Sequence, residues 1–484
     1  MGMERRAEES GSLIQTRLTG SEQYFETSGR YCDAANYPLG GETDARWIPC
    51  GQRIAGCKRR LALTWLKAVT KECLMEAVLQ PINLQNAQDA VRRNKGCAGI
   101  DGRSIGETEQ HWQQHLPEIE AKLRAGTYVP TPLMGMKIAK ANGGERLLGI
   151  PTVQDRIIQQ AVCQILNDKF DRGFSPNSYG YRAGLSAHHA VLMARSYVRE
   201  GKSWVVDIDI SAFFDEVNHD ILLHQISQKI EDKHVLDLIR RYLKTGIMID
   251  GNVERRDKGT PQGSPLSPLL ANIYLDQLDK ELEKRGLSFC RYADDITIYV
   301  SSERSAKRVL ESLTTWIAKH LKLSVNQNKS GTGRPWERQF LSFQITEDGE
   351  IAIAPKGIEG YKAKVRSLWN ARQSLTSKQL VEQWQKYSVG WWNYFKLASN
   401  RLNIEWLAGW TRRHIRKCFW LRWHNKKGRL NALRRLGAKP HQLKVASSSR
   451  GAWRIARSPV LHIVLSNATL RRYGLTVPSE LSTA

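Results

Sequence analysis

Aspartates lie within or beside two short apolar segments that are far apart in the chain. In WVVDIDI, which begins at Trp204, valine and isoleucine alternate with Asp207 and Asp209. In YADDITIYV, the adjacent Asp294 and Asp295 come directly before a second alternating segment. Residues two apart in a β-strand share a face. Both segments are therefore predicted to be strands that have one apolar face and carry carboxylates.

These carboxylates predict a divalent metal site. An Asp-Asp pair at a hairpin is often only a turn, because aspartate tolerates turn conformations. A third carboxylate, Asp209, favours more than a turn, since carboxylates near an apolar core need a partner. Mg²⁺ takes oxygen ligands and links carboxylates to substrate phosphates. Two such ions ~3.5–4 Å apart can activate a 3′-hydroxyl group and stabilise a leaving pyrophosphate, which is the chemistry of a polymerase.

Periodicity predicts an α+β region followed by a helical one. Apolar residues recur at helical spacing in four segments, and strand patterns lie between them. The predicted helices are 74–96, 155–170, 266–286 and 306–325, the last of which leads into a strand, and the predicted strands are 135–151, with a Gly-Gly turn, and 202–214. After residue 360 the pattern loses strand alternation, which predicts a helical domain. Residues 1–70 carry no motif and are left as an extension of unknown structure.

Positive charge is concentrated at the C-terminal end. The net charge is +25, and residues 361–484 hold 25 Lys and Arg against 3 Asp and Glu, together with 9 of the 15 tryptophans. A solvated basic face is one interpretation, but solvated surfaces usually mix both signs of charge. A polyanion partner is favoured, and nucleic acid is the most common one.

The remaining bulk features indicate a cytoplasmic protein. No apolar run approaches the ~20 residues that a membrane span requires, and the first residues lack the apolar stretch of a secretory signal. None of the eight cysteines has the spacing of a zinc site or a disulfide framework.

Ten segments match a known family in order along about residues 70–475. They are GIDG (99–102), KANGGERLLGIPTVQDRIIQQAV (140–162), FSPNSYGYRAGLSAHHAV (174–191), DIDISAFFDEVNHD (207–220), GTPQGSPLSPLLANIYLDQLD (259–279), RYADD (291–295), NQNKS (326–330), FLSFQI (340–345), GWWNYF (390–395) and GAWRIARSPVLH (451–462). The chain resembles the reverse transcriptases encoded by bacterial group II introns, which also act as intron maturases. The resemblance implies an α+β right-hand polymerase fold of fingers and palm, followed by an α-helical thumb or maturase domain.

The resemblance also implies residue roles. Catalysis and metal binding fall to Asp209, Asp294 and Asp295, with the backbone carbonyl of Ile210 as a further metal ligand. A bulky residue that excludes a ribose 2′-hydroxyl group corresponds to Phe213. The remaining nucleotide-binding positions are Lys140 and Arg146 at the triphosphate, Gln262 at the sugar and Lys329 as a general acid toward pyrophosphate.

The domain boundaries implied by the resemblance are 71–355 for fingers and palm, 356–445 for the thumb or maturase domain, and 446–484 for a basic maturase or DNA-binding-like segment. Ser342 departs from the usual glycine of its motif. The family's H-N-H endonuclease has no counterpart, so we expect the compact type, which inserts at available primers such as nicks or replication forks.

The partners implied are group II intron RNA, a DNA target or primer, and deoxynucleoside triphosphates, with two Mg²⁺ ions as cofactors. RNA of this kind is recognised mainly by shape and phosphate contacts. The predicted RNA-binding residues are Arg412, Arg413, Arg416, Lys417 and Arg422. Two alternatives remain open, namely an RNA-binding splicing factor with vestigial polymerase activity and a stand-alone reverse transcriptase used in repair or defence. The sequence also leaves open whether the chain forms a homodimer.

Overall fold

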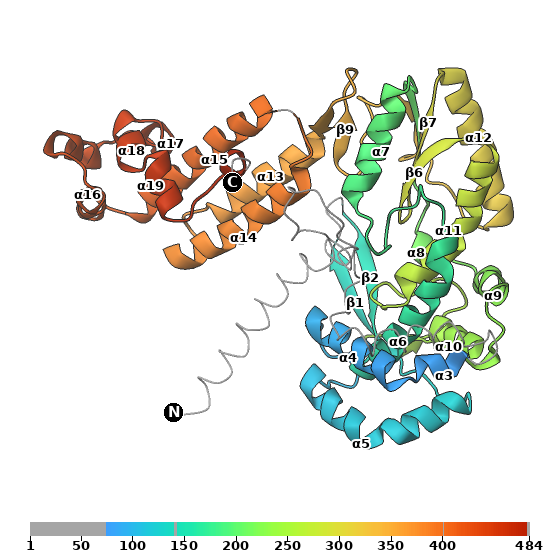
Figure 1. The fold of residues 1–484 in the computed structure, drawn as a ribbon. Helices are drawn as coiled ribbons and strands as arrows, with labels where there is room; N and C mark the ends of the chain where they lie inside the picture. The colour runs from blue at the N-terminus through green and yellow to red at the C-terminus, as the bar shows by residue number, and fades with distance from the viewer. Residues whose placement is uncertain (1–73, 140–142, 400, 482–484) are drawn as a thin grey trace, which may run out of the picture. The chain divides into compact units, whose positions relative to one another are not determined.

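The computed structural model of the chain describes residues 74–139, 143–399 and 401–481 (Figure 1). These residues form two compact units. The first contains the described residues up to Tyr197 together with Gly201–Gly333, and the second contains Val198–Glu200 and the residues from Arg334 onward. Each unit is described separately below.

The first unit combines ten α-helices of the described region with two four-stranded sheets. Its helices are α3 (Leu74–Val78), α4 (Pro81–Asn94), α5 (Ile105–Arg124), α6 (Val153–Phe170), α7 (Ala187–Arg199), α8 (Phe213–Glu216), α9 (His219–Ser227), α10 (Lys233–Lys244), α11 (Ser267–Lys284) and α12 (Glu303–His320), with a 3₁₀ turn, η2 (Asp171–Gly173), after α6. The helices predicted at 155–170, 266–286 and 306–325 are confirmed as α6, α11 and α12. The predicted helix at 74–96 is divided, because Pro81 cannot continue α3 and instead opens α4 as its first residue.

The central sheet of the first unit has the strand order β6-β7-β3-β8. Its strands are β6 (Ser288–Tyr292), β7 (Asp295–Val300), β3 (Trp204–Ile208) and β8 (Gly331–Gly333). All neighbouring pairs are antiparallel. The strand predicted over 202–214 is shorter than expected, because β3 ends at Ile208 and Phe213 begins α8. The inner residues of β3 and β7 join α6, α9, α11 and α12 in one large core.

A second sheet, of order β2-β1-β4-β5, lies in the same unit. It contains β1 (Leu133–Ala139), β2 (Glu145–Ile150), β4 (Ile247–Ile249) and β5 (Asn252–Glu254). The hairpin predicted over 135–151 is confirmed, since β1 and β2 pair antiparallel and Gly143 and Gly144 both have positive φ angles. Glycine adopts such angles without the steric cost that a Cβ would bring.

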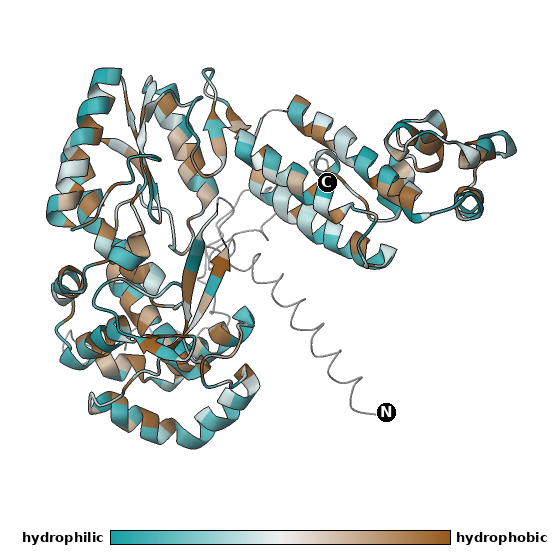
Figure 2. Cartoon of the chain, turned by 180° about the vertical axis from the view of Figure 1, so that it is seen from behind, coloured by the Kyte–Doolittle hydropathy of each residue, from teal (hydrophilic) through white to brown (hydrophobic). Residues whose placement is uncertain are grey.

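The second unit is almost entirely helical in its described residues. A short hairpin of β9 (Phe343–Ile345) and β10 (Ile351–Ile353) precedes α13 (Pro355–Leu368), α14 (Ser377–Phe395), α15 (Arg401–Arg422), α16 (Lys426–Arg435), η3 (Pro440–Ser447), α17 (Ala452–Ile455), α18 (Pro459–Val464), α19 (Asn467–Arg472) and α20 (Pro478–Leu481). Figure 2 shows hydrophobic and hydrophilic residues side by side along these helices, as amphipathic helices require. The predicted α+β organisation followed by a helical domain is confirmed.

Tryptophans build much of the core of the second unit. Trp384 is fully buried beside Tyr361 and Trp369, and its ring nitrogen donates a hydrogen bond to the Thr476 carbonyl oxygen at 2.7 Å. A smaller apolar cluster surrounds Trp420 and includes residues of α16, η3, α17 and α18. The C-terminal helices therefore pack on α14 and α15 instead of extending into solvent.

Candidate active site

The strand register brings the predicted carboxylates to one end of the central sheet. Ile208, the last residue of β3, pairs with Ile296 of β7. Asp209 follows Ile208 and Asp295 precedes Ile296, so the same antiparallel register places Asp209 opposite Asp295. Asp294 lies in the two-residue turn between Tyr292 and Asp295. Residues separated by more than eighty positions in the chain thus meet at one sheet edge.

The Asp209 backbone is held by the loop that follows α12. Its amide donates a hydrogen bond to Ser330 Oγ at 2.9 Å, and its carbonyl oxygen accepts one from the Asn326 amide at 2.8 Å. The side chain is approached by Lys329, whose Nζ atom lies 3.3 Å from Asp209 Oδ2. The Lys329 side chain is 63% exposed, so its ammonium group lies beside the carboxylates and remains open to solvent.

The carboxylates disfavour one another's ionisation. The Asp295 side chain reaches solvent, but the protein packed around it and the charges of Asp294, Asp209 and Asp207 raise its pKa to about 7. Desolvation and the charge of Asp209 also raise the pKa of Asp294. A cation bound between these groups would reverse both effects, because an opposite charge favours the ionised form.

The donor atoms fit a magnesium ion better than a softer metal. Asp209, Asp294 and Asp295 offer only oxygen, which Mg²⁺ prefers. Among the residues that the structure describes, no three carboxylate, histidine or cysteine side chains form a preformed cluster around one point. This agrees with the habit of Mg²⁺ of retaining water and binding through one or two carboxylates plus substrate phosphates.

Two of the residues predicted to contact the nucleotide lie on or beside strand β2. Arg146 is on β2, paired with Ile138 of β1, and its positive charge partly offsets the rise in the pKa of Asp294. Lys140 lies outside the described residues. The Gln262 carbonyl oxygen accepts a hydrogen bond from the Gly149 amide at 3.0 Å, which ties the 259–263 loop to β2.

The two phenylalanines at the start of α8 differ in burial. Phe213 is 3% exposed and packs toward Tyr274, with ring centroids 6.3 Å apart. Phe214 is only partly buried and meets Phe213 edge-on at 5.3 Å. Ile210, whose carbonyl was predicted to be a metal ligand, is buried and bridges to Val325.

The predicted RNA-binding residues of α15 fall into two groups. Arg416 is 3% exposed and donates hydrogen bonds to the Leu465 carbonyl and Asn467 Oδ1, while Arg412 pairs with Glu480 at 2.7 Å. Similarly, Arg422 donates to the Leu375 carbonyl oxygen. These three therefore hold the unit together.

Two other residues of that set are on a different face of α15. Arg413 and Lys417 lie 5.3 and 5.9 Å from the ring centroid of Trp453 on α17. They form a surface pair of cations beside a partly exposed indole, here called the Trp453 surface.

Several residues at the site were missed by sequence reasoning. Gly180 and Tyr181 lie against the Asp294–Asp295 turn, and Arg291 lies beneath it. A Cβ on Gly180 would stand 2.2 Å from the Ala293 amide nitrogen. Burial raises the pKa of the Tyr181 hydroxyl, and the charges of Asp294 and Asp295 raise it further. The motif FSPNSYGYRAG was the available signal, since a glycine fixed between two aromatic residues can mark a close backbone approach.

Two protein families match the chain. The reverse transcriptase (RNA-dependent DNA polymerase) family matches residues 138–345, and the maturase-specific domain of group II introns matches residues 358–437. The chain therefore carries a reverse transcriptase domain followed by a group II intron maturase-specific domain. The first match contains all three aspartates, and the second covers α15 with most of α13 and all of α14 and α16. The predicted family, the right-hand polymerase fold and the combination of polymerase and maturase domains are confirmed.

Two curated proteins and one solved structure are similar to parts of the chain. Protein YkfC of Escherichia coli (strain K12) is 28% identical over 57% of this chain and 84% of its own length. Group II intron-encoded protein LtrA of Lactococcus lactis subsp. cremoris is 37% identical over 45% of this chain and 36% of its own length. A chain of the partial Cas6-RT-Cas1–Cas2 complex shares 27% identity, covers 50% of this chain and 42% of that chain, and has a TM-score of 0.33. The match thus spans only about a third of LtrA.

None of the helices in the described part of the chain is both long and apolar enough to cross a membrane.

Proposed function

We propose that the protein binds a group II intron RNA, assists its splicing and copies it into cDNA from a DNA primer during retrohoming. The observation that carries this proposal is the meeting of Asp209 with Asp294 and Asp295 at one sheet edge, inside the region that matches reverse transcriptases. The maturase-specific match favours the intron role over a stand-alone enzyme of repair or defence. An intact carboxylate set favours active polymerase over a vestigial one.

Within this proposal the aspartates would hold two Mg²⁺ ions, with the Ile210 carbonyl as a further ligand. When bound, the ions would activate the primer 3′-hydroxyl group and stabilise the leaving pyrophosphate. Lys329 would donate a proton to the leaving pyrophosphate, a role supported by the position of its ammonium group 3.3 Å from Asp209 Oδ2. Arg146, together with Lys140, would hold the triphosphate, and Gln262 would contact the sugar.

The gate against ribonucleotides is proposed at the Phe213–Phe214 pair. Either substitution to alanine should open space for a 2′-hydroxyl group, because the two rings support each other edge-on. We expect both variants to incorporate UTP at least about tenfold more readily relative to dTTP, a change of ~1.4 kcal/mol in discrimination. Phe213→Ala should also lower stability by about 3–5 kcal/mol, since Phe213 is buried. Single-nucleotide extension and thermal melting measure both effects. Unchanged discrimination in both variants would place the gate elsewhere.

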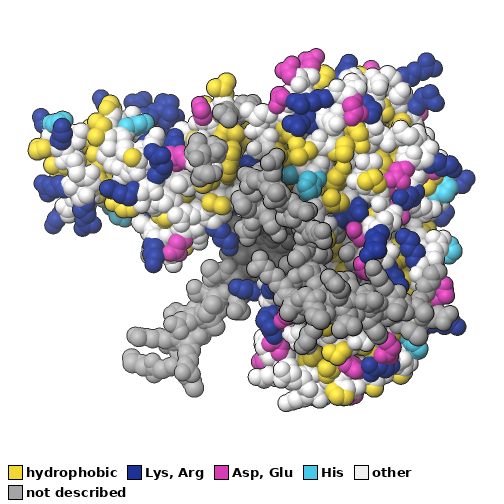
Figure 3. Space-filling view, in the orientation of Figure 1, with side chains coloured by type: hydrophobic (Ala, Val, Ile, Leu, Met, Phe, Trp, Pro, Cys, Tyr) yellow, Lys and Arg dark blue, Asp and Glu magenta, His cyan; other side chains and the backbone are white. Residues whose placement is uncertain are grey.

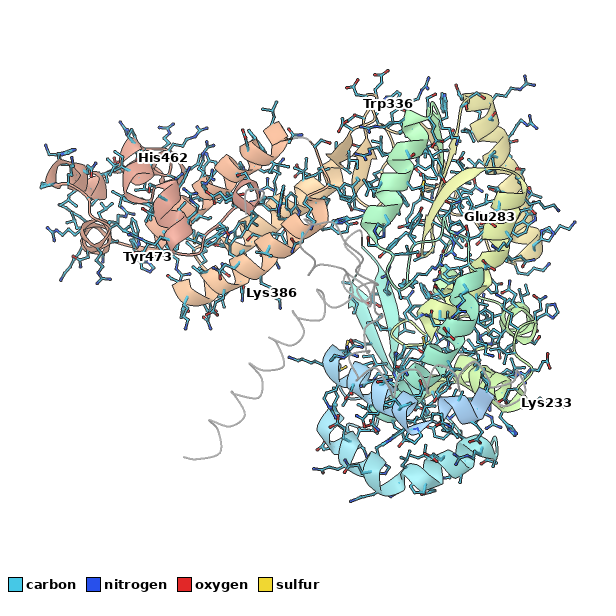
Figure 4. The ribbon with its side chains drawn as sticks, in the orientation of Figure 1. Lys233, Glu283, Trp336, Lys386, His462 and Tyr473 are labelled. Carbon is cyan, nitrogen blue, oxygen red and sulfur yellow. The ribbon has the colours of Figure 1, made fainter. Side chains whose placement is uncertain are left out.

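RNA binding is proposed for the acid-free part of the second unit. Residues 406–479 contain no Asp or Glu, and Figure 3 shows Lys and Arg side chains gathered over the C-terminal helices with few acidic ones. Exposed aromatic residues occur among them, including Tyr473, which is 51% exposed and labelled in Figure 4. Phosphate contacts by such cations dominate affinity and make it depend on salt. Of the residues predicted in α15, Arg413 and Lys417 are the ones whose geometry leaves them for RNA.

Replacing Arg413 and Lys417 together by glutamine tests this assignment. We expect weaker binding of structured intron RNA, and a plot of log affinity against log salt whose slope falls by about one per lost phosphate contact. A matched control is Arg304→Gln with Arg308→Gln on α12, where Glu303 and Glu311 lie among the cations. Filter binding at several salt concentrations measures both the affinity and the salt slope. An equal loss in the control, or no change in slope for the Trp453 surface, would argue against the assignment.

The domain boundaries, the source of the primer, the cellular location and the oligomeric state form part of the same proposal. We assign residues 71–355 to fingers and palm, 356–445 to thumb or maturase and 446–484 to a basic DNA-binding-like segment, while the two compact units divide at Gly333–Arg334. Priming from nicks or replication forks, a location in the bacterial cytoplasm or nucleoid, and a homodimer are further elements that experiment must test.

A further inference from the structure

Arg291 is a fully buried arginine directly beneath the turn that carries Asp294 and Asp295. It is on β6, is 0% exposed, and uses its side-chain nitrogens in five hydrogen bonds. Nε and Nη2 form a two-pronged pair with Asp279, at 2.7 and 2.5 Å. A guanidinium is the side chain best suited to such a planar fork.

The other contacts of Arg291 join three separate segments. Nη1 donates to Asn272 Oδ1 on α11 at 2.9 Å and to the Ala293 carbonyl oxygen in the turn at 2.9 Å. Nη2 donates to Ser178 Oγ at 2.7 Å, in the segment before α7. Arg291 therefore connects α11 and the 177–180 segment to the backbone of the aspartate turn.

The turn needs such support because its backbone is strained. Ala293 has a φ angle of 59°, in the left-handed region that residues with a Cβ rarely adopt. Gly180 closes the other side of the turn, and the Asn272 side-chain amide fixes the Gly180 carbonyl oxygen at 2.9 Å. Strained residues persist where surrounding contacts over-determine them. Here the contacts come from Arg291 on one side and from Gly180 on the other.

We propose that Arg291 is a positioning residue, which holds the Ala293 carbonyl so that Asp294 and Asp295 can bind divalent cations opposite Asp209. This role rests on the proposed polymerase function. It goes beyond stabilising the fold, because the pair with Asp279 would satisfy both charges without the Nη1 bond to the turn. Groups that orient metal ligands typically change metal affinity or activity by about 10–100-fold when removed.

Two variants separate positioning from stability. The double variant Arg291→Met with Asp279→Leu removes both buried charges and keeps the volume apolar, a replacement that is often neutral for stability. Arg291→Lys keeps a charge but loses the fork. Leu123→Ala, in the buried face of α5, serves as a control that is destabilised without any change near the turn. Asp294→Asn controls for the metal-binding signal.

The measurements are Mn²⁺ binding by electron paramagnetic resonance, melting temperature, and kcat and KM for dTTP in primer extension. We expect the double variant to melt close to the wild type, yet to bind Mn²⁺ about 10–100-fold more weakly and to lose kcat more than KM. Arg291→Lys should lose more Mn²⁺ affinity than Leu123→Ala at an equal or smaller drop in melting temperature. This second comparison decides the matter if the double variant does not fold.

The opposite results are equally clear. Wild-type Mn²⁺ affinity in a folded double variant would overturn the positioning role while leaving the polymerase proposal intact. The same conclusion would follow if Arg291→Lys lost no more Mn²⁺ affinity than Leu123→Ala. A wild-type protein that binds no Mn²⁺ even with primer–template and dTTP present, and that extends no primer, would overturn the polymerase proposal itself, and the role of Arg291 with it.

Discussion

Asp294→Asn should abolish DNA synthesis while leaving the fold and RNA binding intact. Asparagine keeps the size and the turn conformation of aspartate but removes the negative charge that a divalent cation requires. A metal ion at such a site stabilises developing charge by several kcal/mol, so the loss should be on the order of a thousandfold or more. Primer extension measures the activity, and RNA binding measured in parallel reports on the second unit.

The matched control for this substitution is Asp237→Asn. Asp237 lies on α10, half exposed and paired with Arg240, so the same chemical change occurs away from the carboxylates. We expect full activity in this variant. Substantial synthesis by Asp294→Asn would show that the metal ligands have been assigned to the wrong carboxylates. Parallel loss of RNA binding would indicate misfolding instead.

Gly180→Ala should impair synthesis nearly as strongly, although Gly180 has no chemical role. A Cβ there would stand 2.2 Å from the Ala293 amide nitrogen and 3.0 Å from the Tyr292 carbonyl carbon. Both contacts are with backbone, so the aspartate turn itself must shift. A displacement of about 1 Å at reacting groups can cost roughly 100-fold in rate. Steady-state primer extension should show the loss mainly in kcat.

Gly106→Ala provides the comparison for a glycine with open surroundings. Gly106 lies in the first turn of α5, and a Cβ there would meet no atom within 4 Å. That variant should keep its activity and be slightly more stable, since alanine favours a helix. If Gly180→Ala retained wild-type kcat, the turn would tolerate displacement, and its tight packing would have no catalytic meaning.

Local patterns were sufficient to predict much of the fold. Strict alternation around Asp209 and Asp295 identified β3 and β7, because residues two apart share a face. Helical periodicity identified α6, α11 and α12. The end of β3 at Ile208 was not predictable from the same signal, since the apolar Phe213 and Phe214 continue the pattern while α8 bends the chain away.

Contacts between distant segments could not be predicted from local patterns. Nothing in the sequence distinguishes Arg291 from an ordinary charged residue beside the aspartates, because its burial depends on α11 and on the 177–180 segment. The arginines of α15 show the same limit, since Arg413 and Arg416 differ in role only through the helices that pack on one face. Spacing indicates which residues share a face, but the packing partners decide which face is covered.

The most direct measurement is primer extension by the purified wild-type protein on poly(rA) primed with oligo(dT), using dTTP with and without Mg²⁺. We expect DNA synthesis that requires the metal, that proceeds on the RNA template, and that is lost when the metal is chelated. Synthesis of this kind would establish an RNA-templated DNA polymerase, and its loss in Asp294→Asn would assign the activity to the carboxylates of Asp209, Asp294 and Asp295. No synthesis by folded protein, on this template or on its own intron RNA, would contradict the polymerase function and leave an RNA-binding splicing factor.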